Sequence, residues 1–353
     1  MKTRSLLLCG WLLLAGLASL RGQDFHYSQF ANAPLHLSPG LTGVFGGNTR
    51  LTSNFRSQWS SVPVKYRTFS VGVDHKYDCG RSSRGYFSSG LDLNYDRAGD
   101  SRLTWANVGL YGSYTYPTGQ RTFLTFGLQA GLGQRSFDPE DLRFGNQFDP
   151  FLGIYDPTIT TGENFANTSH LFFDLGTGLN FRWQALNRGS LIDLLDKRSK
   201  LDVGIGVHHL NRPDMSFIED AKVRLPIRTS AYANATLQLN DPLDLRLGFT
   251  AQFQGPYREY VAQGGLNIFL NREPGQQWML MAGVGYRFHD FGDAFYPALE
   301  LEYHNTLRVG VSYDINVSDF NVATDRRGGL ELNVRYLFRK VCPLPEFKFC
   351  PLL

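Results

Sequence analysis

The stretch LFFDLGTGLNFRWQ at positions 171–184 carries the pattern from which the fold is predicted. Successive side chains of a strand point to opposite faces, so every second residue shares a face. One face runs from Leu171 to Trp183 and is mainly apolar, whereas Asp174, Asn180 and Arg182 lie on the other. A transmembrane barrel needs this alternation because lipid covers its outside and water its lumen. Soluble β-sandwiches alternate as well, so the loops and motifs must separate the two classes.

Alternating runs bounded by turn residues recur along the whole chain and predict about 14 antiparallel strands. The predicted strands are 49–59, 67–77, 86–96, 103–116, 122–134, 169–184, 199–209, 227–239, 243–254, 259–270, 276–288, 295–304, 306–317 and 328–338. Their number is even, as expected for bacterial single-chain outer-membrane barrels. The fold class predicted is therefore all-β, a transmembrane outer-membrane β-barrel over residues 49–338.

The lengths of the predicted loops support a membrane barrel. The connections 240–242 and 271–275 and the single residue Asn305 are tight, and all three fall at one end, where the longer connection 185–198 is an exception. The long connections 135–168 and 210–226 fall at the other end. Outer-membrane barrels have short periplasmic turns and long outer loops, so the tight end is predicted to face the periplasm.

The first residues of the chain predict export. Lys2 and Arg4 precede an apolar run at 6–20, so residues 1–22 read as a secretory signal peptide. The formal net charge of +3 comes from residues that this cleavage removes, which gives no electrostatic case for binding nucleic acid. No later run approaches the roughly 18 apolar residues of a membrane helix, so strands must do any spanning. The domains expected after the signal peptide are a periplasmic segment at 23–48, the barrel, and a periplasmic tail at 339–353.

A set of short motifs, in order along the chain, resembles the PorP/SprF family of type IX secretion membrane proteins. The matching stretches are QDFHYSQF at 23–30, PL at 34–35, PGLTG at 39–43, RLTSNFRSQW at 50–59, FGLQAGL at 126–132, FDP at 148–150, GVHHLNRP at 206–213, YDINVS at 313–318, GGLE at 328–331 and YLF at 336–338. The resemblance implies a bacterial outer-membrane barrel of the type IX secretion and gliding motility machinery. It implies partners among the periplasmic ring proteins or a secreted adhesin, and it implies no reaction.

The periplasm-facing segments are the predicted contacts of this barrel. The candidate docking residues are Gln23, Asp24, Ser28, Gln29, Pro34, Leu191, Leu194 and Leu195. The last three belong to a short amphipathic helix predicted within 185–198, which either packs on the barrel rim or docks a partner. In the tail, Cys342 and Cys350 either form a disulfide in the oxidising periplasm or remain free thiols.

Other functions find less support in the residues. His208 and His209 are expected on opposite faces of one strand, so they cannot share a metal ion. An outer-membrane hydrolase would need a nucleophile and a base on one face, and no G-x-S-x-G motif is present. No enzyme activity, cofactor or metal is therefore predicted. The alternative to a secretion role is a passive porin or small-solute channel. Closely spaced opposite charges on the lumen face favour a plugged lumen over a selectivity ring.

Overall fold

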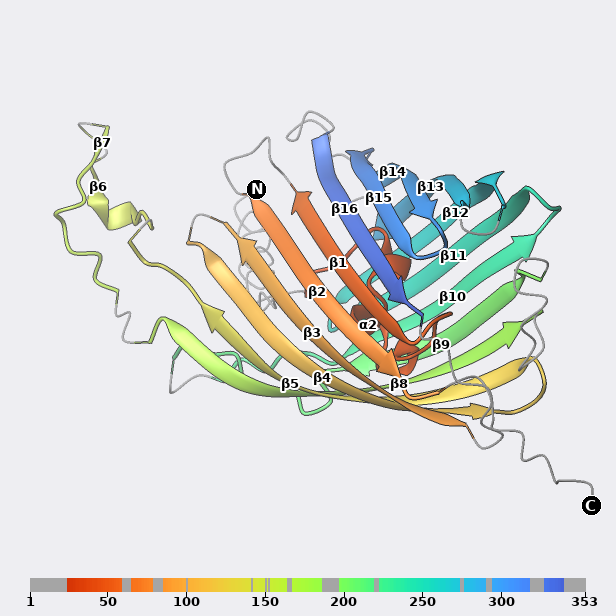
Figure 1. Ribbon diagram of the computed structural model, residues 1–353. Helices are drawn as coiled ribbons and strands as arrows, with labels where there is room; N and C mark the ends of the chain where they lie inside the picture. The colour runs from red at the N-terminus through yellow and green to blue at the C-terminus, as the bar shows by residue number, and fades with distance from the viewer. Residues whose placement is uncertain are drawn as a thin grey trace, which may run out of the picture.

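Fourteen strands of the described residues close into one antiparallel barrel (Figure 1). The computed structural model describes residues 24–58, 65–78, 85–99, 101–140, 142–149, 151, 153–163, 167–185, 197–218, 222–273, 276–289, 294–317 and 327–339. The barrel strands are β1 (Thr49–Gln58), β2 (Tyr66–Lys76), β3 (Tyr86–Ala98), β4 (Leu103–Pro117), β5 (Thr122–Ser136), β8 (Ser169–Gln184), β9 (Lys200–His208), β10 (Arg228–Gln238), β11 (Leu243–Gln254), β12 (Tyr257–Asn271), β13 (Trp278–His289), β14 (Ala294–Tyr303), β15 (Leu307–Asn316) and β16 (Arg327–Phe338). Every predicted strand is confirmed, with each boundary within two residues of the predicted one.

Closure joins the first strand to the last. β1 pairs with β16 in a continuous register from Thr49 opposite Phe338 to Gln58 opposite Gly329. All other neighbours in the wall are consecutive barrel strands. A closed wall leaves no unpaired strand edge, so backbone groups at bilayer depth bond to each other. None of the helices in the described residues is long and apolar enough to cross a bilayer.

The two ends of the barrel differ. Tight connections at 239–242, 272–277 and 304–306 define the short-turn end, and positive φ angles at His304 and Asn305 suit a tight hairpin there. The segments 137–168 and 209–227 define the long-loop end. In Figure 1, the first of them extends away from the wall and carries the small hairpin of β6 (Phe148–Asp149) and β7 (Ile154–Tyr155).

Burial is inverted relative to a soluble protein. Large apolar side chains on the outer face are exposed, with Leu110 63% and Leu171 66% exposed. Polar side chains on the inner face are buried, with Asn180 fully buried and Glu331 only 1% exposed. On β8 the exposed residues are those of the apolar face read from the sequence. Such an outer face is stable only in a medium that is itself apolar.

An arginine placed in the middle of the outer face is expected to destabilise the barrel. Leu110→Arg lies midway along β4 and should lower the free energy of unfolding by about 2–4 kcal/mol in lipid vesicles, because a cation meets hydrocarbon there. Leu239→Arg, beside a short turn, is the control and should cost about 0–1 kcal/mol. Denaturant titration measures the free energy of unfolding of both variants, with the folded fraction read from the separate bands of folded and unfolded barrel on a gel. Equal costs at the two positions would contradict a bilayer-immersed wall.

The barrel is filled by its own N-terminal segment. Residues 24–45, here called the plug, form η1 (Phe30–Asn32), α2 (Pro34–Leu37) and η2 (Pro39–Leu41) inside the wall (Figure 1). The main apolar cluster of the protein joins plug and wall, for example Phe30 and Leu37 with Tyr232 and Val261. The core therefore lies in the lumen and depends on both.

The sequence predicted that this segment lies outside the barrel in the periplasm, and the structure differs. Asp24 contacts His209 and Gln254 at the long-loop end, and the chain descends until Gly43 contacts Asp74 near the short turns. The physical reason is the polar lumen wall, whose buried carboxylates and amides require hydrogen-bond partners. The plug supplies those partners.

Candidate functional site

The anchor of the plug is a carboxylate that accepts two consecutive backbone N–H groups. The N–H groups of Ser28 and Gln29 donate to the two oxygens of Glu331, each over 2.9 Å. Two hydrogen bonds to one carboxyl group fix both the position and the direction of the plug backbone at this point. The Ser28 hydroxyl also donates to Asp314 at 2.9 Å. Two strands near the barrel seam, β15 and β16, thus hold one turn of the plug.

Cations complete this anchor. Arg56 and Arg287 place guanidinium groups 2.8 and 3.0 Å from the Asp314 carboxylate. Arg56 also donates to the backbone oxygen of His26 at 2.6 Å. Side chains from four strands therefore converge on residues 26–29 with matched charges. This cluster agrees with the expectation from the sequence that opposite charges lie close together in the lumen.

A row of three glycines receives the next part of the plug. Gly127 on β5 pairs with Gly178 on β8, and Gly178 pairs with Gly206 on β9. A Cβ atom at Gly178 would lie 2.7 Å from the Gly40 nitrogen, and one at Gly206 would lie 2.8 Å from Ser38 Cα. Only glycine lets the plug backbone approach the wall so closely. The sequence analysis did not single out this row as a contact surface.

At the long-loop end, an imidazole joins the plug to the wall. His209 contacts Asp24 of the plug at 2.7 Å and Asp174 of β8 at 2.9 Å, and Arg228 lies 3.3 Å from Asp24. Burial opposes the charged imidazole, yet the two carboxylates raise the pKa of His209 to about 9. Burial alone would raise the pKa of Asp24, but the His209 and Arg228 cations bring it well below its usual range.

His209 corrects one expectation from the sequence. His208 and His209 were placed on opposite faces, but both side chains are buried, with ring centroids 6.3 Å apart. β9 ends at His208, and a φ of 59° at His209 turns its ring back into the lumen. The described residues hold no group of three or more His, Cys, Asp or Glu side chains that could bind a metal.

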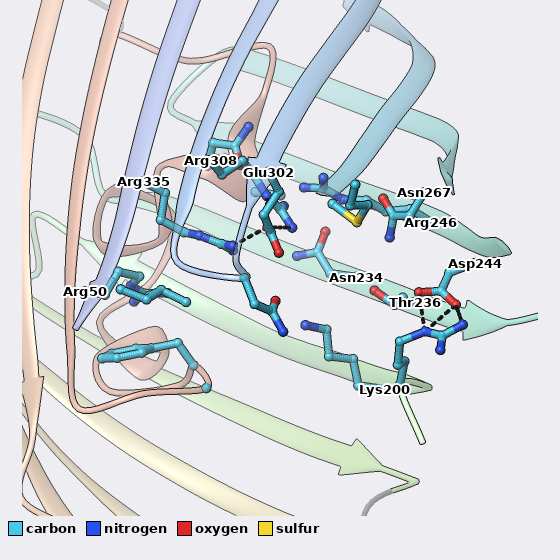
Figure 2. Close-up of a pocket in the computed structure, with 18 of the residues that line it drawn as sticks. Arg50, Lys200, Asn234, Thr236, Asp244, Arg246, Asn267, Glu302, Arg308 and Arg335 are labelled. Carbon is cyan, nitrogen blue, oxygen red and sulfur yellow. Dashed lines mark hydrogen bonds and ion pairs between the residues drawn. The ribbon is translucent and has the colours of Figure 1, made fainter. Parts of the chain in front are cut away.

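A cavity of about 360 Å³ remains at the short-turn end, below the plug (Figure 2). This short-turn vestibule is lined by plug residues such as Phe45, by lumen-facing residues of the wall, and by residues at the turns such as Asn305. Its charged lining residues among those described are Arg50, Arg182, Arg198, Lys200, Asp202, Asp244, Arg246, Arg272, Glu302, Arg308, Arg335 and Arg339. Cations outnumber carboxylates on its surface by nine to three, so its potential is positive.

The predicted docking residues fall into two groups. Asp24, Ser28, Gln29 and Pro34 are all buried within the plug, and the first three of them bond to the wall, so in this conformation they face no partner. Gln23, Leu191, Leu194, Leu195, Cys342 and Cys350 lie outside the described residues, as do the predicted signal peptide and tail beyond residue 339. Their predicted roles remain predictions.

Comparison with known families accounts for nearly the whole chain. Residues 19–336 match the family described as type IX secretion system membrane protein PorP/SprF. The chain belongs to the PorP/SprF family. It is therefore an outer-membrane β-barrel protein of the type IX secretion system. The family is one of membrane barrels of a secretion system.

The solved structures that this chain matches include channels and a transporter. The CymD monoaromatic hydrocarbon channel is 10% identical, with 91% of this chain and 96% of that chain covered and a TM-score of 0.48. A FadL homologue of Pseudomonas aeruginosa is 12% identical, with 86% and 93% covered and a TM-score of 0.48. The toluene transporter TbuX of Ralstonia pickettii is 11% identical, with 87% and 94% covered and a TM-score of 0.46. The comparison with curated proteins gives no match.

Proposed function

We propose that this PorP/SprF protein is a closed, non-catalytic component of the type IX machinery, which docks periplasmic ring proteins or supports export and surface attachment of cargo such as adhesins. The observation that carries the proposal is the plug, because it fills the lumen that a porin would need open. The plug is held at more than one level along the barrel axis. The backbone of Ser28 and Gln29 bonds to Glu331, and the backbone near Gly40 packs against the glycine row. A barrel closed in this way acts through its surfaces rather than through solute flow.

The periplasmic surface is the proposed docking face. Because Asp24, Ser28 and Gln29 are engaged in the lumen, the segments 185–198 and 339–353 are the proposed contacts. The first contains Leu191, Leu194 and Leu195, which form an apolar stripe if the segment is helical.

Loss of the protein is expected to abolish surface display of type IX cargo. A clean gene deletion should leave the cargo inside the cell or its periplasm, and re-expression of the protein should restore it to the surface. Immunodetection of the cargo on intact cells measures this. Normal display in the deletion strain, with no related protein substituting, would contradict the proposal.

A triple variant tests the docking face within the same experiment. Leu191→Ser, Leu194→Ser and Leu195→Ser together should reduce cargo display while the barrel still assembles in the outer membrane. The matched control changes Asn187, Arg188 and Ser190 to alanine in the same segment and should leave display intact. Full display with the triple serine variant would remove this segment from the proposed contacts.

The alternative function is a passive channel, and the short-turn vestibule is the observation that favours it. The cavity enters the barrel from the proposed periplasmic end and reaches Ala31, Asn32 and Pro34 of the plug. Solutes can enter it, but the plug lies between it and the long-loop end. The conductance experiment in the Discussion separates the two functions.

A further inference from the structure

The short-turn vestibule contains cationic groups whose bonding capacity is not fully used by the residues that the structure describes. The Lys200 side chain projects into the cavity (Figure 2), and its ammonium group makes no hydrogen bond or ion pair with the described residues. The Nε atom of Arg335 is buried and has no hydrogen-bond partner among the ranges given above, although its Nη2 atom donates to Glu302 at 2.7 Å. Within the described part of the chain, the Arg339 side chain donates only to the backbone oxygen of Asn305. The buried Arg335 Nε is costly to leave without an acceptor, whereas Lys200 and Arg339 are exposed and bond to water until a ligand replaces it.

The remaining cations of the vestibule are held in fixed positions. Their partners within 3.5 Å are Asp74 for Arg50, Asp202 for Arg182, Asp244 for Arg198, Asp241 for Arg272, and Glu300 for Arg246 and Arg308. Aromatic rings support two of these cations, because the guanidinium carbons of Arg50 and Arg198 lie 4.6 and 4.5 Å from the ring centres of Phe45 and Phe269. The positive field of the cavity is thus preorganised rather than assembled on binding.

The position of the vestibule limits what can reach it. The wall separates it from lipid, and the plug covers it on the long-loop side. Lys200, Asn305 and Arg339 are exposed at the short-turn end, so a ligand enters from the periplasm. Besides cations, the lining includes Trp278, Leu337 and other apolar side chains. A ligand that offers both carboxylates and apolar groups matches this surface, and a peptide segment does so.

We propose that the short-turn vestibule binds an acidic peptide segment presented from the periplasm, with side-chain carboxylates bonding to Lys200, Arg335 and Arg339. The inference rests on the proposed function in one respect, because the segment would belong to a component or cargo of the secretion machinery. Binding fixes the barrel to its periplasmic partner without opening the lumen. A volume of about 360 Å³ holds a few residues of such a segment rather than a folded domain.

Fluorescence anisotropy of a labelled hexaglutamate peptide, added to the full-length protein in lipid nanodiscs, tests this proposal. We expect saturable binding that weakens as salt increases, with no binding of hexaglutamine. Lys200→Gln should weaken binding by about fivefold, because it removes a cation without breaking an ion pair of the described residues. Lys222→Gln, which removes an exposed cation at the long-loop end, is the matched control and should bind like the wild type.

Three results would overturn the proposal. The first is absence of hexaglutamate binding by the folded protein. The second is equal weakening by Lys200→Gln and Lys222→Gln, which would place binding outside the vestibule. The third is displacement of the peptide by pyrophosphate at far lower concentrations than by unlabelled peptide, which would identify a phosphate-bearing ligand instead. The proposed secretion role is tested separately by cargo display, so failure of peptide binding would overturn this proposal and not that role.

Discussion

Substitution of Gly178 by leucine is expected to push the plug off the wall and let ions pass through the lumen. The missing side chain of Gly178 leaves room for Ser38 and Gly40 of the plug, and a Cβ atom there would lie 2.7 Å from the Gly40 nitrogen. The Gly40 nitrogen belongs to the backbone and cannot rotate away as a side chain can, so the plug backbone must leave the row Gly127, Gly178 and Gly206 to make room. Small shifts of the neighbouring atoms do not make enough room for a leucine side chain. Overpacking of this kind lowers the free energy of unfolding by about 1–3 kcal/mol.

Single-channel recording in planar bilayers measures the result. The wild type should show no stable conductance, whereas Gly178→Leu should show long-lived or frequent openings. Gly112→Leu is the matched control, because Gly112 lies on the outer face of β4 with open space around its Cβ position. Deletion of residues 24–45 provides a second variant if leucine impairs assembly, and the folded band on a gel verifies both. A wild-type barrel that conducts as well as the deletion variant would favour the channel function.

Loss of His209 is expected to release the long-loop end of the plug. The imidazole lies between Asp24 and Asp174, so His209→Ala leaves two buried carboxylates with one fewer cation. Removal of one partner from a buried ion pair costs about 3–5 kcal/mol. Arg228 still faces Asp24, which confines the damage to this end of the plug. Hydrogen exchange at the Asp24 amide, which donates to Gln254, reports the release.

The His209 imidazole also makes retention of the plug depend on pH. The pKa of His209 is raised from 6.5 to about 9 in the folded protein, which corresponds to about 3 kcal/mol. A raised pKa stabilises the folded form fully below pH 6.5, and the contribution is lost as the pH rises through about 9. Protection of the Asp24 amide, corrected for intrinsic exchange, should therefore fall between pH 7 and 10. His209→Gln should show no such fall, and an identical fall in that variant would contradict the assignment.

Local patterns allowed the wall to be predicted. β8 begins and ends where the alternation at 169–184 begins and ends, because a period of two is visible within a single strand. Tight connections such as 240–242 also revealed which end carries the short turns. The small hairpin of β6 and β7 was not predicted, since each of its strands is only two residues long.

The plug could not be predicted in the same way, because its contacts join residues far apart in the chain. Ser28 bonds to Glu331, 303 positions away, and the segment 24–45 has no regular period. The charges of the lumen face did favour a plugged lumen, but they did not identify the segment that fills it. A second signal was not read as a contact: Gly127, Gly178 and Gly206 lie on the lumen face, where a polar wall has no need of glycine.

The position of Ser28 gives the most direct test of the whole account. In a protein whose own cysteines are replaced by serine, Ser28→Cys should resist a membrane-impermeant maleimide in isolated outer membranes and react only after denaturation, because Ser28 is fully buried in the lumen. Asn240→Cys, in an exposed short turn, is the control and should react at once. Rapid labelling of Ser28→Cys in native membranes, at the rate of Asn240→Cys, would place the segment in the periplasm and contradict the plugged barrel.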